Sequence, residues 1–244
     1  MVQEGIMETF EIGEVYAIHN APGKDFGKFH TTAGPIMAAA DTFHIHVTGK
    51  GGHGARPYDC VAPVVAACGI VTALQTIVSR NHNTAGSLVI SPTQIHTGTT
   101  DNVLPEKAYI NGTVRTFDKE VQAMVVRRME EVVAGQAAAY GCEAKLEFEF
   151  GYPPTVNDAD KAAFAARVAA DVAGEDGVDT AITPVMGAED FSYMLEARPG
   201  AYLMLGQGDG AGVHHPKYNF NDEIAPIGAS FLARLVETAQ PVAR

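Results

Sequence analysis

The sequence predicts an α/β fold that is interrupted by a smaller α+β domain. Residues 41–150 show periodic segments in the order strand, helix, strand, strand, helix, strand, which is the ferredoxin-like (βαββαβ) plan. On both sides of this stretch, short apolar strands alternate with helices, as they do in an α/β layer. We therefore expect residues 1–37 and 152–244 to form one α/β domain and residues 38–151 to form an inserted domain.

The first α/β segment is expected to hold a short helix and a strand. Apolar residues recur at every fourth position in residues 1–10, which indicates one side of a helix. The apolar run over residues 15–18 predicts a strand that ends in His19. Residues 24–40 are expected to form a loop that crosses to the inserted domain.

The inserted domain contains both kinds of periodicity. Its strand segments alternate apolar and polar side chains, whereas its helix segments repeat an apolar residue at helical spacing. Pro92 indicates a kink or an edge strand, because proline cannot donate a hydrogen bond to a sheet. Strands are expected over residues 41–49, 86–97, 107–116 and 143–150, and helices over residues 61–80 and 118–140.

The second α/β segment is expected to contain three helices and one buried strand. Asn157 or Asp158 can cap the first helix, since both side chains accept hydrogen bonds from backbone N–H groups. Glu189 and Asp190 are expected to open the second helix. Helices are expected over residues 158–173, 188–197 and 223–239, and the strand over residues 200–206.

The composition excludes several classes of partner. The 244 residues carry a net charge of −12, which argues against nucleic acid and anionic membranes as partners. No uninterrupted apolar stretch approaches the ~20 residues that cross a bilayer, and the first residues lack the features of a signal peptide. Cys60, Cys68 and Cys142 are odd in number and form no C-x-x-C motif, which favours a reducing cytoplasm.

A glycine-rich turn follows the first strand of the inserted domain. Four of the residues 49–54 are glycines, and they surround His53. Glycine lets the backbone take positive φ angles and pass close to another object, so the turn presents a histidine between a strand and a helix. A solvated histidine in an ordinary strand–helix turn is the alternative interpretation, since short motifs carry false positives.

Two histidines and a carboxylate are the candidate metal ligands in the α/β segments. His19 follows a strand, His214 follows a glycine-rich loop, and Glu189 lies near the start of a helix. Imidazole and carboxylate groups bind zinc and similar divalent ions, and catalytic sites assemble them from distant segments. Three such groups are few for a dinuclear site. The alternatives are a structural role for His19 and a carboxylate stabilised by the helix N-terminus for Glu189.

Several polar residues of the inserted domain have a simple structural interpretation. His44 and His46 share one face of a strand and could bind a metal, although a solvated strand face explains them more simply. Arg115, which faces away from Val114, could hold a carboxylate through two nitrogens, or it could form a surface ion pair. Asn102 is most simply a turn residue.

Seven motifs occur in a specific order over nearly the whole chain. They are V-Y-A-I-H-N-A-P-G (15–23), G-P-I-M-A-A-A-D (34–41), G-K-G-G-H-G-A-R-P (49–57), D-N-V-L-P-E (101–106), G-T-V-R-T-F (112–117), G-A-E-D-F-S-Y (187–193) and H-H-P-K-Y-N-F-N-D-E (214–223). Together they resemble the zinc-dependent aminoacylase/carboxypeptidase superfamily. The branch they resemble is the N-acyl-amino-acid amidohydrolases, typified by hippurate hydrolase and the plant auxin-conjugate hydrolases.

The resemblance implies part of a di-zinc α/β catalytic domain with an inserted ferredoxin-like lid that forms a homodimer. His19 and His214 match metal ligands of the family, and Glu189 matches a residue of the cleft near the metals. The implied cofactor is a divalent metal ion, zinc before manganese or cobalt.

The resemblance also assigns roles to three lid residues. His53 matches the histidine that reaches a catalytic site, often that of the partner subunit, and stabilises the developing oxyanion. Asn102 and Arg115 match groups that hold the substrate carboxylate. The implied substrate is a small N-acyl amino acid, which is hydrolysed to a carboxylic acid and an amino acid.

One departure from the family affects this expectation. Family members carry a Cys-x-His or His-x-Asp metal motif and a Glu-Glu pair, which includes the general base, upstream of the region matched here. The chain resembles roughly the C-terminal three-fifths of such an enzyme. We therefore expect the chain as written to be inactive or nearly so, and a non-catalytic dimeric binding module or a truncated gene product are the alternatives.

Overall fold

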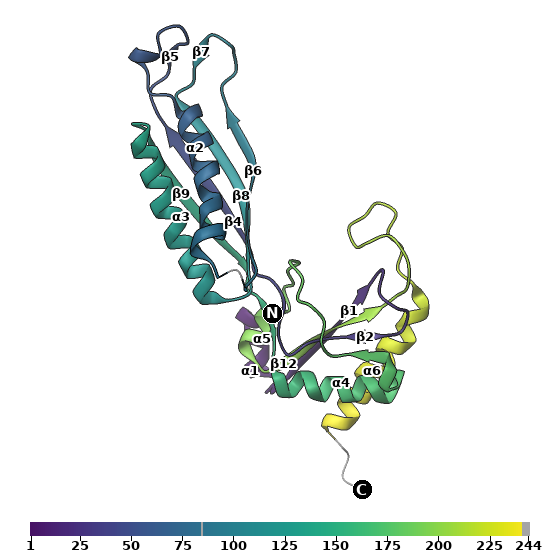
Figure 1. Cartoon of the computed structure of the whole chain (residues 1–244). Coiled ribbons are helices and arrows are strands. Elements are labelled where there is room, and N and C mark those ends of the chain that lie inside the picture. Colours follow the sequence, from purple (N-terminus) through teal and green to yellow (C-terminus); the bar gives the residue numbers. More distant parts are fainter. Residues whose placement is uncertain (84, 241–244) are drawn as a thin grey trace. The chain divides into compact units, whose positions relative to one another are not determined.

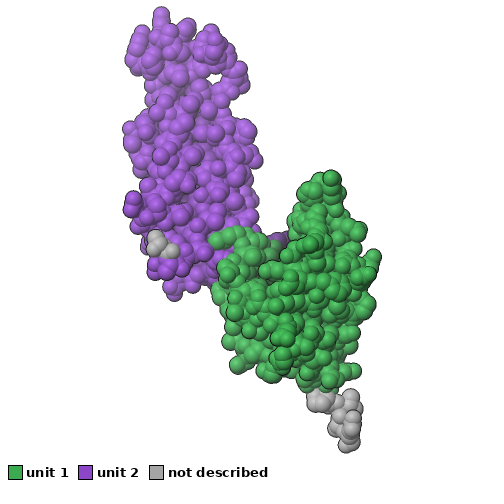
Figure 2. Space-filling view, turned by 45° about the vertical axis from the view of Figure 1, so that its right-hand side comes forward, with its two compact units in different colours: residues 1–37, 154–244 green, residues 38–153 purple. Residues whose placement is uncertain are grey.

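The computed structural model describes residues 1–83 and 85–240. The chain divides into two compact units, which are Met1–Met37 with Pro154–Arg244 (unit 1) and Ala38–Pro153 (unit 2) (Figure 2). The second crossing between the units lies slightly after the position expected from the sequence. Each unit has its own hydrophobic core.

Unit 2 has the predicted ferredoxin-like architecture. Its sheet has the strand order β6-β8-β4-β9, and each neighbouring pair is antiparallel. Helices α2 and α3 cover one face of this sheet (Figure 1). The elements are β4 (Ala40–Thr48), α2 (Pro63–Thr76) with a π-helical continuation (Ile77–Asn81), β6 (Leu88–Thr97), β8 (Lys107–Thr116), α3 (Lys119–Ala139) and β9 (Glu143–Tyr152).

Strand periodicity places the core of unit 2 between sheet and helices. Phe43, Ile45 and Val47 alternate along β4 and are fully or almost fully buried. They pack with apolar residues of both helices, among them Ile70 and Met129. The intervening residues of β4 lie on the opposite face of the sheet, which no helix among the described residues of this unit covers, so polar side chains are tolerated there.

Pro92 lies in the edge strand β6, where the register with β8 shifts between Pro92 and Gln94. The sequence prediction for this residue is therefore confirmed. Two further short strands, which the sequence did not predict, pair in an antiparallel fashion beyond the main sheet. They are β5 (Gly52–His53) and β7 (Val103–Leu104).

The helix of unit 2 over Pro63–Asn81 is, by length and composition, apolar enough to cross a membrane. Polar residues such as Thr72, Gln75 and Arg80 interrupt its sequence, in line with the expectation of no uninterrupted apolar stretch of that length. Ala66, Ile70 and Leu74 of this helix are completely buried against the sheet and α3. A core helix passes the same test, and since 33% of the apolar part of this helix is buried, packing within unit 2 accounts for part of its apolar character.

Unit 1 is built on a four-stranded mixed sheet with the order β1-β12-β2-β11. β12 is parallel to β1 and antiparallel to β2, and β11 is parallel to β2. Helices α4 and α6 pack on one face of the sheet around Phe29, Leu203 and Phe231. The elements are β1 (Val15–Ala21), β2 (Phe29–His30), β3 (Gly34–Met37), β10 (Thr155–Asn157), α4 (Ala159–Ala173), β11 (Val178–Asp179), α5 (Ser192–Ala197), β12 (Gly200–Gly206) and α6 (Ala225–Ala239).

Three local predictions for unit 1 are corrected. The expected helix over residues 1–10 is divided by Gly5, whose φ of 78° is left-handed, into a 3-10 turn (Val2–Glu4) and α1 (Ile6–Thr9). The expected loop over residues 24–40 contains β2 and β3, which are too short to show a period in sequence. The second helix begins at Ser192 rather than at residue 188.

Asp158, and not Asn157, caps α4. The Asp158 carboxylate accepts hydrogen bonds of 3.0 Å from the backbone N–H groups of Asp160 and Lys161. The Asn157 side chain is buried instead, and its Oδ1 accepts a hydrogen bond of 2.7 Å from the backbone N–H of Tyr202. Asp158 therefore caps helix α4, whereas its neighbour Asn157 bonds to strand β12.

Candidate functional site

His19 is placed inside a strand and not at its end. β1 continues to Ala21, and His19 lies opposite Met204 of β12. Its Nδ1 is 2.7 Å from the carbonyl oxygen of Asn20. A carbonyl oxygen only accepts hydrogen bonds, so Nδ1 carries the proton of the neutral ring and Nε2 presents a lone pair. Metal-binding histidines commonly have this arrangement.

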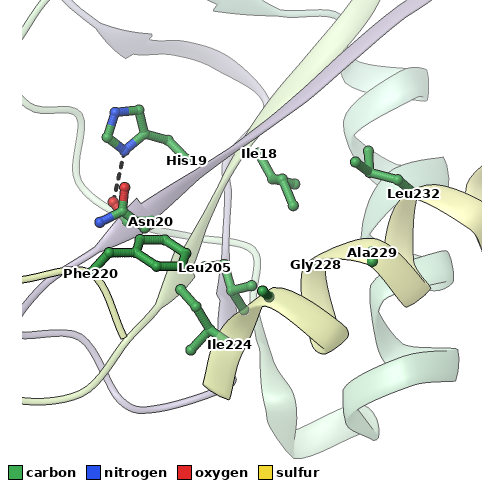
Figure 3. Close-up of a pocket in the computed structure, with 10 residues that line it drawn as sticks. Ile18, His19, Asn20, Leu205, Phe220, Ile224, Gly228, Ala229 and Leu232 are labelled. Atoms are coloured by element: carbon green, nitrogen blue, oxygen red, sulfur yellow. Dashed lines mark hydrogen bonds between the residues drawn. The ribbon is translucent and has the colours of Figure 1, made fainter. Parts of the chain in front are cut away.

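An apolar groove of about 390 Å³ lies beside His19, between β1, the end of β12 and α6 (Figure 3). Ile18 and Leu205 contribute side chains from the strands, and Phe220 contributes one from the loop before α6. Phe220 and Leu232 are 39% and 41% exposed, respectively. Because β1 is also an edge strand of its sheet, unit 1 presents apolar side chains and an open strand edge next to His19.

Tyr202, which the sequence analysis did not single out, lies between His19 and Glu189. Its hydroxyl donates a hydrogen bond of 3.0 Å to Oε2 of Glu189, and its ring centroid is 6.4 Å from that of His19. Burial, followed by the charges of Glu189 and Asp190, raises the pKa of Tyr202, so the hydroxyl remains a donor. The available signal was a tyrosine in an otherwise apolar strand.

Glu189 precedes α5 and does not open it. The helix begins at Ser192, whose hydroxyl donates a hydrogen bond of 2.7 Å to the backbone carbonyl of Glu189. The carboxylate is held by Tyr202 instead. The predicted stabilisation by a helix N-terminus is therefore replaced by a side-chain contact.

His214 lies in the exposed loop between β12 and α6, with a left-handed φ of 67°. In residues 1–83 and 85–240, no group of three or more His, Cys, Asp or Glu side chains could hold a metal ion. Catalytic zinc takes three protein ligands, so the donors described here do not fit a complete metal centre. His19 and His214 stay predicted ligands of a site that needs further donors.

His53 and Asn102 are brought together by the strand pair β5–β7. The backbone N–H of Gly54 donates a hydrogen bond of 2.8 Å to the carbonyl of Asn102. The backbone N–H of Ala55 donates one of 3.1 Å to Nδ1 of His53. Because Nδ1 accepts, Nε2 carries the proton of the neutral ring, and the exposed His53 side chain can donate a hydrogen bond outward.

The glycines around His53 are explained by close backbone contacts. None of the glycines in residues 49–54 has a positive φ, which corrects the first of the two roles expected for them. A Cβ at Gly51 would lie 2.9 Å from the carbonyl oxygen of Leu104, and one at Gly54 would lie 3.0 Å from that of Asn102. Gly51 and Gly54 therefore lie close to the backbone around β7, whereas Gly49 and Gly52 lie close to Val61 and Cys60.

Arg115 has one anchored nitrogen and one open edge. It lies on the face of β8 opposite to α2 and α3, and its Nη1 donates to the hydroxyl of Thr113 and, at 2.9 Å, to the carbonyl of Val114. No described residue accepts a hydrogen bond from Nε or Nη2. These two nitrogens form the edge of the guanidinium group that binds a carboxylate in a bidentate manner.

Arg115 and Asn102 lie at opposite ends of the unit 2 sheet. Asn102 precedes β7, which adjoins the start of β8 at Lys107, whereas Arg115 lies near the end of β8. The eight residue-to-residue steps from Lys107 to Arg115 span roughly 26 Å of extended strand. One copy of unit 2 therefore cannot place both residues on the carboxylate of one small molecule.

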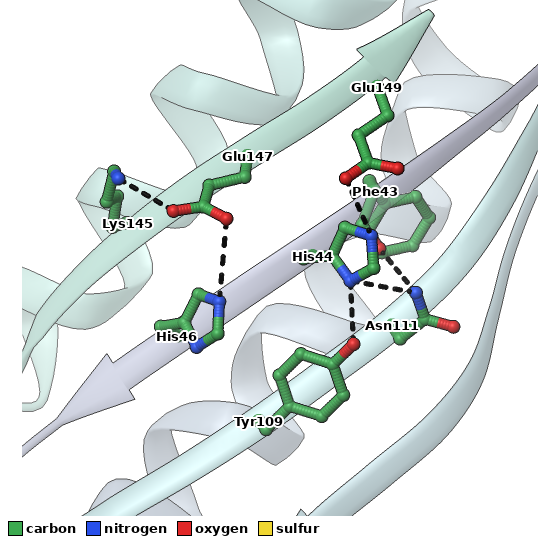
Figure 4. A network of polar contacts seen from close by, with 8 residues as sticks. All are labelled: Phe43, His44, His46, Tyr109, Asn111, Lys145, Glu147 and Glu149. Atoms are coloured by element: carbon green, nitrogen blue, oxygen red, sulfur yellow. Dashed lines mark hydrogen bonds and ion pairs between the residues drawn. The ribbon is translucent and has the colours of Figure 1, made fainter. Parts of the chain in front are cut away.

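The histidines of β4 belong to a polar network on the open face of the sheet (Figure 4). Nδ1 of His44 lies 2.6 Å from the hydroxyl of Tyr109, and its Nε2 lies 3.6 Å from Glu149. Nε2 of His46 lies 3.8 Å from Glu147. These cross-strand contacts support the interpretation of a polar strand face and not that of a metal site.

Comparison with known proteins places these features in a family. The family model described as "Peptidase family M20/M25/M40" matches residues 1–238. An N-acetyl-L-cysteine deacetylase of Bacillus subtilis is 38% identical over 240 residues, which cover 98% of this chain and 56% of the relative. Hippurate hydrolase of Campylobacter jejuni is 33% identical over 235 residues, which cover 96% of this chain and 61% of the relative.

Solved structures show the same fold. A protein from Bacillus subtilis, described as a dinuclear metal binding peptidase from M20 family, superimposes with a TM-score of 0.81 at 28% sequence identity. The match covers 98% of this chain and 60% of that structure. The chain therefore spans clearly less than two thirds of the length of the relatives it matches.

Proposed function

This chain belongs to peptidase family M20/M25/M40, an enzyme family, and we propose that it supplies the substrate-binding part of an N-acyl-amino-acid amidohydrolase. The reaction of such an enzyme adds water across the amide bond and releases a carboxylic acid and an amino acid. Relatives named hippurate hydrolase and N-acetyl-L-cysteine deacetylase support this class of substrate. The observation that carries the proposal is the open edge of Arg115.

Arg115 binds the carboxylate of the amino-acid part of the substrate. Its Nη1 is held by Thr113 and Val114, so the guanidinium plane is oriented before a ligand arrives. Nε and Nη2 then provide two parallel donors for the two carboxylate oxygens. The fixed orientation lowers the entropic cost of placing the amide bond for attack.

His53 stabilises the oxygen of the amide carbonyl. The contact from Ala55 leaves the proton of the neutral ring on Nε2, which is the nitrogen that can donate to a developing negative charge. The short strand pair β5–β7 holds His53 next to Asn102, so both residues reach the same end of a substrate. Asn102 supplies an amide group for a second polar contact there.

The distance between the two ends of the unit 2 sheet favours a homodimer through this lid. A substrate bound to Arg115 of one copy can contact His53 and Asn102 only if a second copy supplies these two residues. The edge strand β6, with Ile95 46% exposed, offers an unpaired strand edge for such an interface. The partners in this proposal are thus a small N-acyl amino acid and a second copy of the chain.

The metal chemistry needs donors beyond those described. A divalent ion, with zinc preferred over manganese or cobalt, remains our proposal for the cofactor, with His19 and His214 among its ligands. We propose that a polypeptide corresponding to the unmatched part of the relatives packs on the groove and the open strand edge beside His19. We propose that the 244-residue chain alone does not turn over its substrate.

Ligand binding tests the substrate class. We expect calorimetry to detect binding of hippurate, and Arg115→Lys to weaken it by about tenfold or more, because lysine cannot form the bidentate contact. Hippuramide, which lacks the carboxylate, should bind the parent chain and Arg115→Lys equally. Arg128→Lys is the matched control, since Arg128 pairs with Glu131 on the surface of α3. Equal affinity of the parent chain for hippurate and hippuramide would contradict the proposal.

A turnover assay separates the enzyme from the second candidate, a non-catalytic binding module. The incomplete set of metal donors in the described part of the chain favours binding without turnover for the chain alone. Hippurate hydrolysis should appear only when the unmatched segment of a relative is added together with zinc, manganese or cobalt ions. Hydrolysis by the chain alone would overturn the proposed inactivity, and binding without turnover in both cases would favour the binding module.

A further inference from the structure

Asp41 is a buried carboxylate that the proposed function does not use. It is 1% exposed and lies at the start of β4 on the helix-covered face of the unit 2 sheet. Its Oδ2 accepts a hydrogen bond of 2.6 Å from Nε2 of Gln122 in α3. Its Oδ1 accepts one of 3.2 Å from the backbone N–H of Gly151 in β9. A single side chain therefore joins three elements.

The contact with Gly151 occurs at a β-bulge. Ala40 pairs with Tyr152, and Thr42 pairs with Glu149, so β9 has an extra residue opposite Asp41. A bulge interrupts the hydrogen bonds of the ladder, and the Asp41 carboxylate accepts the N–H of the bulged segment in their place. A Cβ at Gly151 would lie 1.9 Å from the carbonyl oxygen of Ala40, so the bulge requires glycine there.

The backbone carbonyl group of Asp41 connects this bulge to Arg115 through hydrogen bonds. The carbonyl oxygen of Asp41 accepts a hydrogen bond of 3.0 Å from the hydroxyl of Thr113. Nη1 of Arg115 donates to the same Thr113 hydroxyl and lies 3.5 Å from the same carbonyl oxygen. The carbonyl group of Asp41 thus contacts both the Thr113 hydroxyl and the anchored nitrogen of Arg115, which the carbonyl of Val114 also holds.

We propose that Asp41 is a positioning residue for Arg115: its carboxylate holds the bulge of β9, and its carbonyl, through Thr113, orients the guanidinium group toward the substrate carboxylate. This inference rests on the proposed function, in which Arg115 binds the substrate carboxylate. The buried carboxylate is satisfied by Gln122 and Gly151. Burial raises the pKa of Asp41, and those two contacts lower it.

The motion of the Arg115 guanidinium group tests the proposal without any ligand. NMR of protein labelled with ¹⁵N-arginine measures the rotation rate about the Nε–Cζ bond, and Arg115→Lys identifies the signal. In Asp41→Ala we expect this rate to rise by about tenfold, the effect of losing one hydrogen bond to a charged group. Asp41→Asn should restore the slow rotation, because an amide can still accept from Gly151 while Gln122 turns its own amide.

A matched control separates positioning from stability. Gln122→Met also removes one hydrogen bond of Asp41, but it leaves the contact with Gly151, so Arg115 should keep its slow rotation while stability falls. Thr113→Val, on the uncovered face of the sheet, should free Arg115 even if Asp41→Ala does not fold. An unchanged rate in Asp41→Ala or in Thr113→Val would overturn the proposal, as would an equal increase in Gln122→Met. Failure to bind hippurate would count against the proposed function alone.

Discussion

The hydroxyl of Tyr202 donates a hydrogen bond of 3.0 Å to Glu189, whose carboxylate it holds on the side of β12 where His19 lies. Tyr202 is only 3% exposed, whereas Glu189 is partly exposed. The buried Tyr202 side chain thus positions the Glu189 carboxylate, in place of the N-terminus of the following helix α5. This contact explains why a tyrosine occurs in β12, a strand whose residues are almost all buried.

Tyr202→Phe should lower the free energy of unfolding of unit 1 by about 1–2 kcal/mol, because a hydrogen bond to a charged group is lost from a buried side chain. Urea denaturation followed by circular dichroism measures the change. Tyr16→Phe is the control, since the Tyr16 hydroxyl makes a similar bond to Glu14 near the surface. If Tyr16→Phe lowered the free energy of unfolding as much as Tyr202→Phe does, burial would not explain the strength of the Tyr202 contact.

Unit 1 should lose stability as the pH falls below about 6.5, the ordinary pKa of histidine. Burial, assisted by the charge of Lys24, lowers the pKa of His30, which is 5% exposed. Between the lowered pKa and 6.5 the unfolded chain binds more protons than the folded one, so folding is disfavoured as pH falls. His30→Phe should flatten this dependence in urea titrations between pH 7 and pH 5. An unchanged slope would show that other groups cause it.

The two neighbours before α4 should respond differently to substitution. Asp158→Ala removes a helix cap and should cost about 1 kcal/mol. Asn157→Ala removes a buried amide that bonds to Thr31, Thr32 and Tyr202, so it should cost about 3 kcal/mol or more. Thermal or urea unfolding of both variants provides the comparison, and equal losses would refute the assignment.

Two glycine-to-alanine substitutions in unit 2 should have opposite signs. Gly151→Ala places a Cβ 1.9 Å from the carbonyl of Ala40 and should destabilise the unit by about 1–3 kcal/mol. Gly135 lies inside α3 with open space around its added Cβ, so Gly135→Ala should stabilise the unit by about 0.5–1 kcal/mol. Stability measured by urea titration decides both, and a neutral Gly151→Ala would show that the bulge can relax.

Long periodic elements could be predicted from the sequence, and so could the family. The strands of unit 2 and their buried face follow from alternating residues such as Phe43 and Ile45, and the edge position of β6 is indicated by Pro92. Elements of two to four residues, such as β2 and β5, show no period and depend on partners distant in sequence. The start of α5 was also beyond prediction, because Glu189 bonds to Tyr202 and not to the helix.

The sequence by itself determined which residue types are available for chemistry: His19, His53, Asn102, Arg115 and His214. The tertiary structure decided how they are presented. It assigned the donor nitrogens of His19 and His53 through backbone contacts, and it left one edge of Arg115 open. It also separated Arg115 from Asn102 along one sheet. These outcomes depend on hydrogen bonds and strand register between distant segments, which hydrophobic periodicity along the chain does not encode.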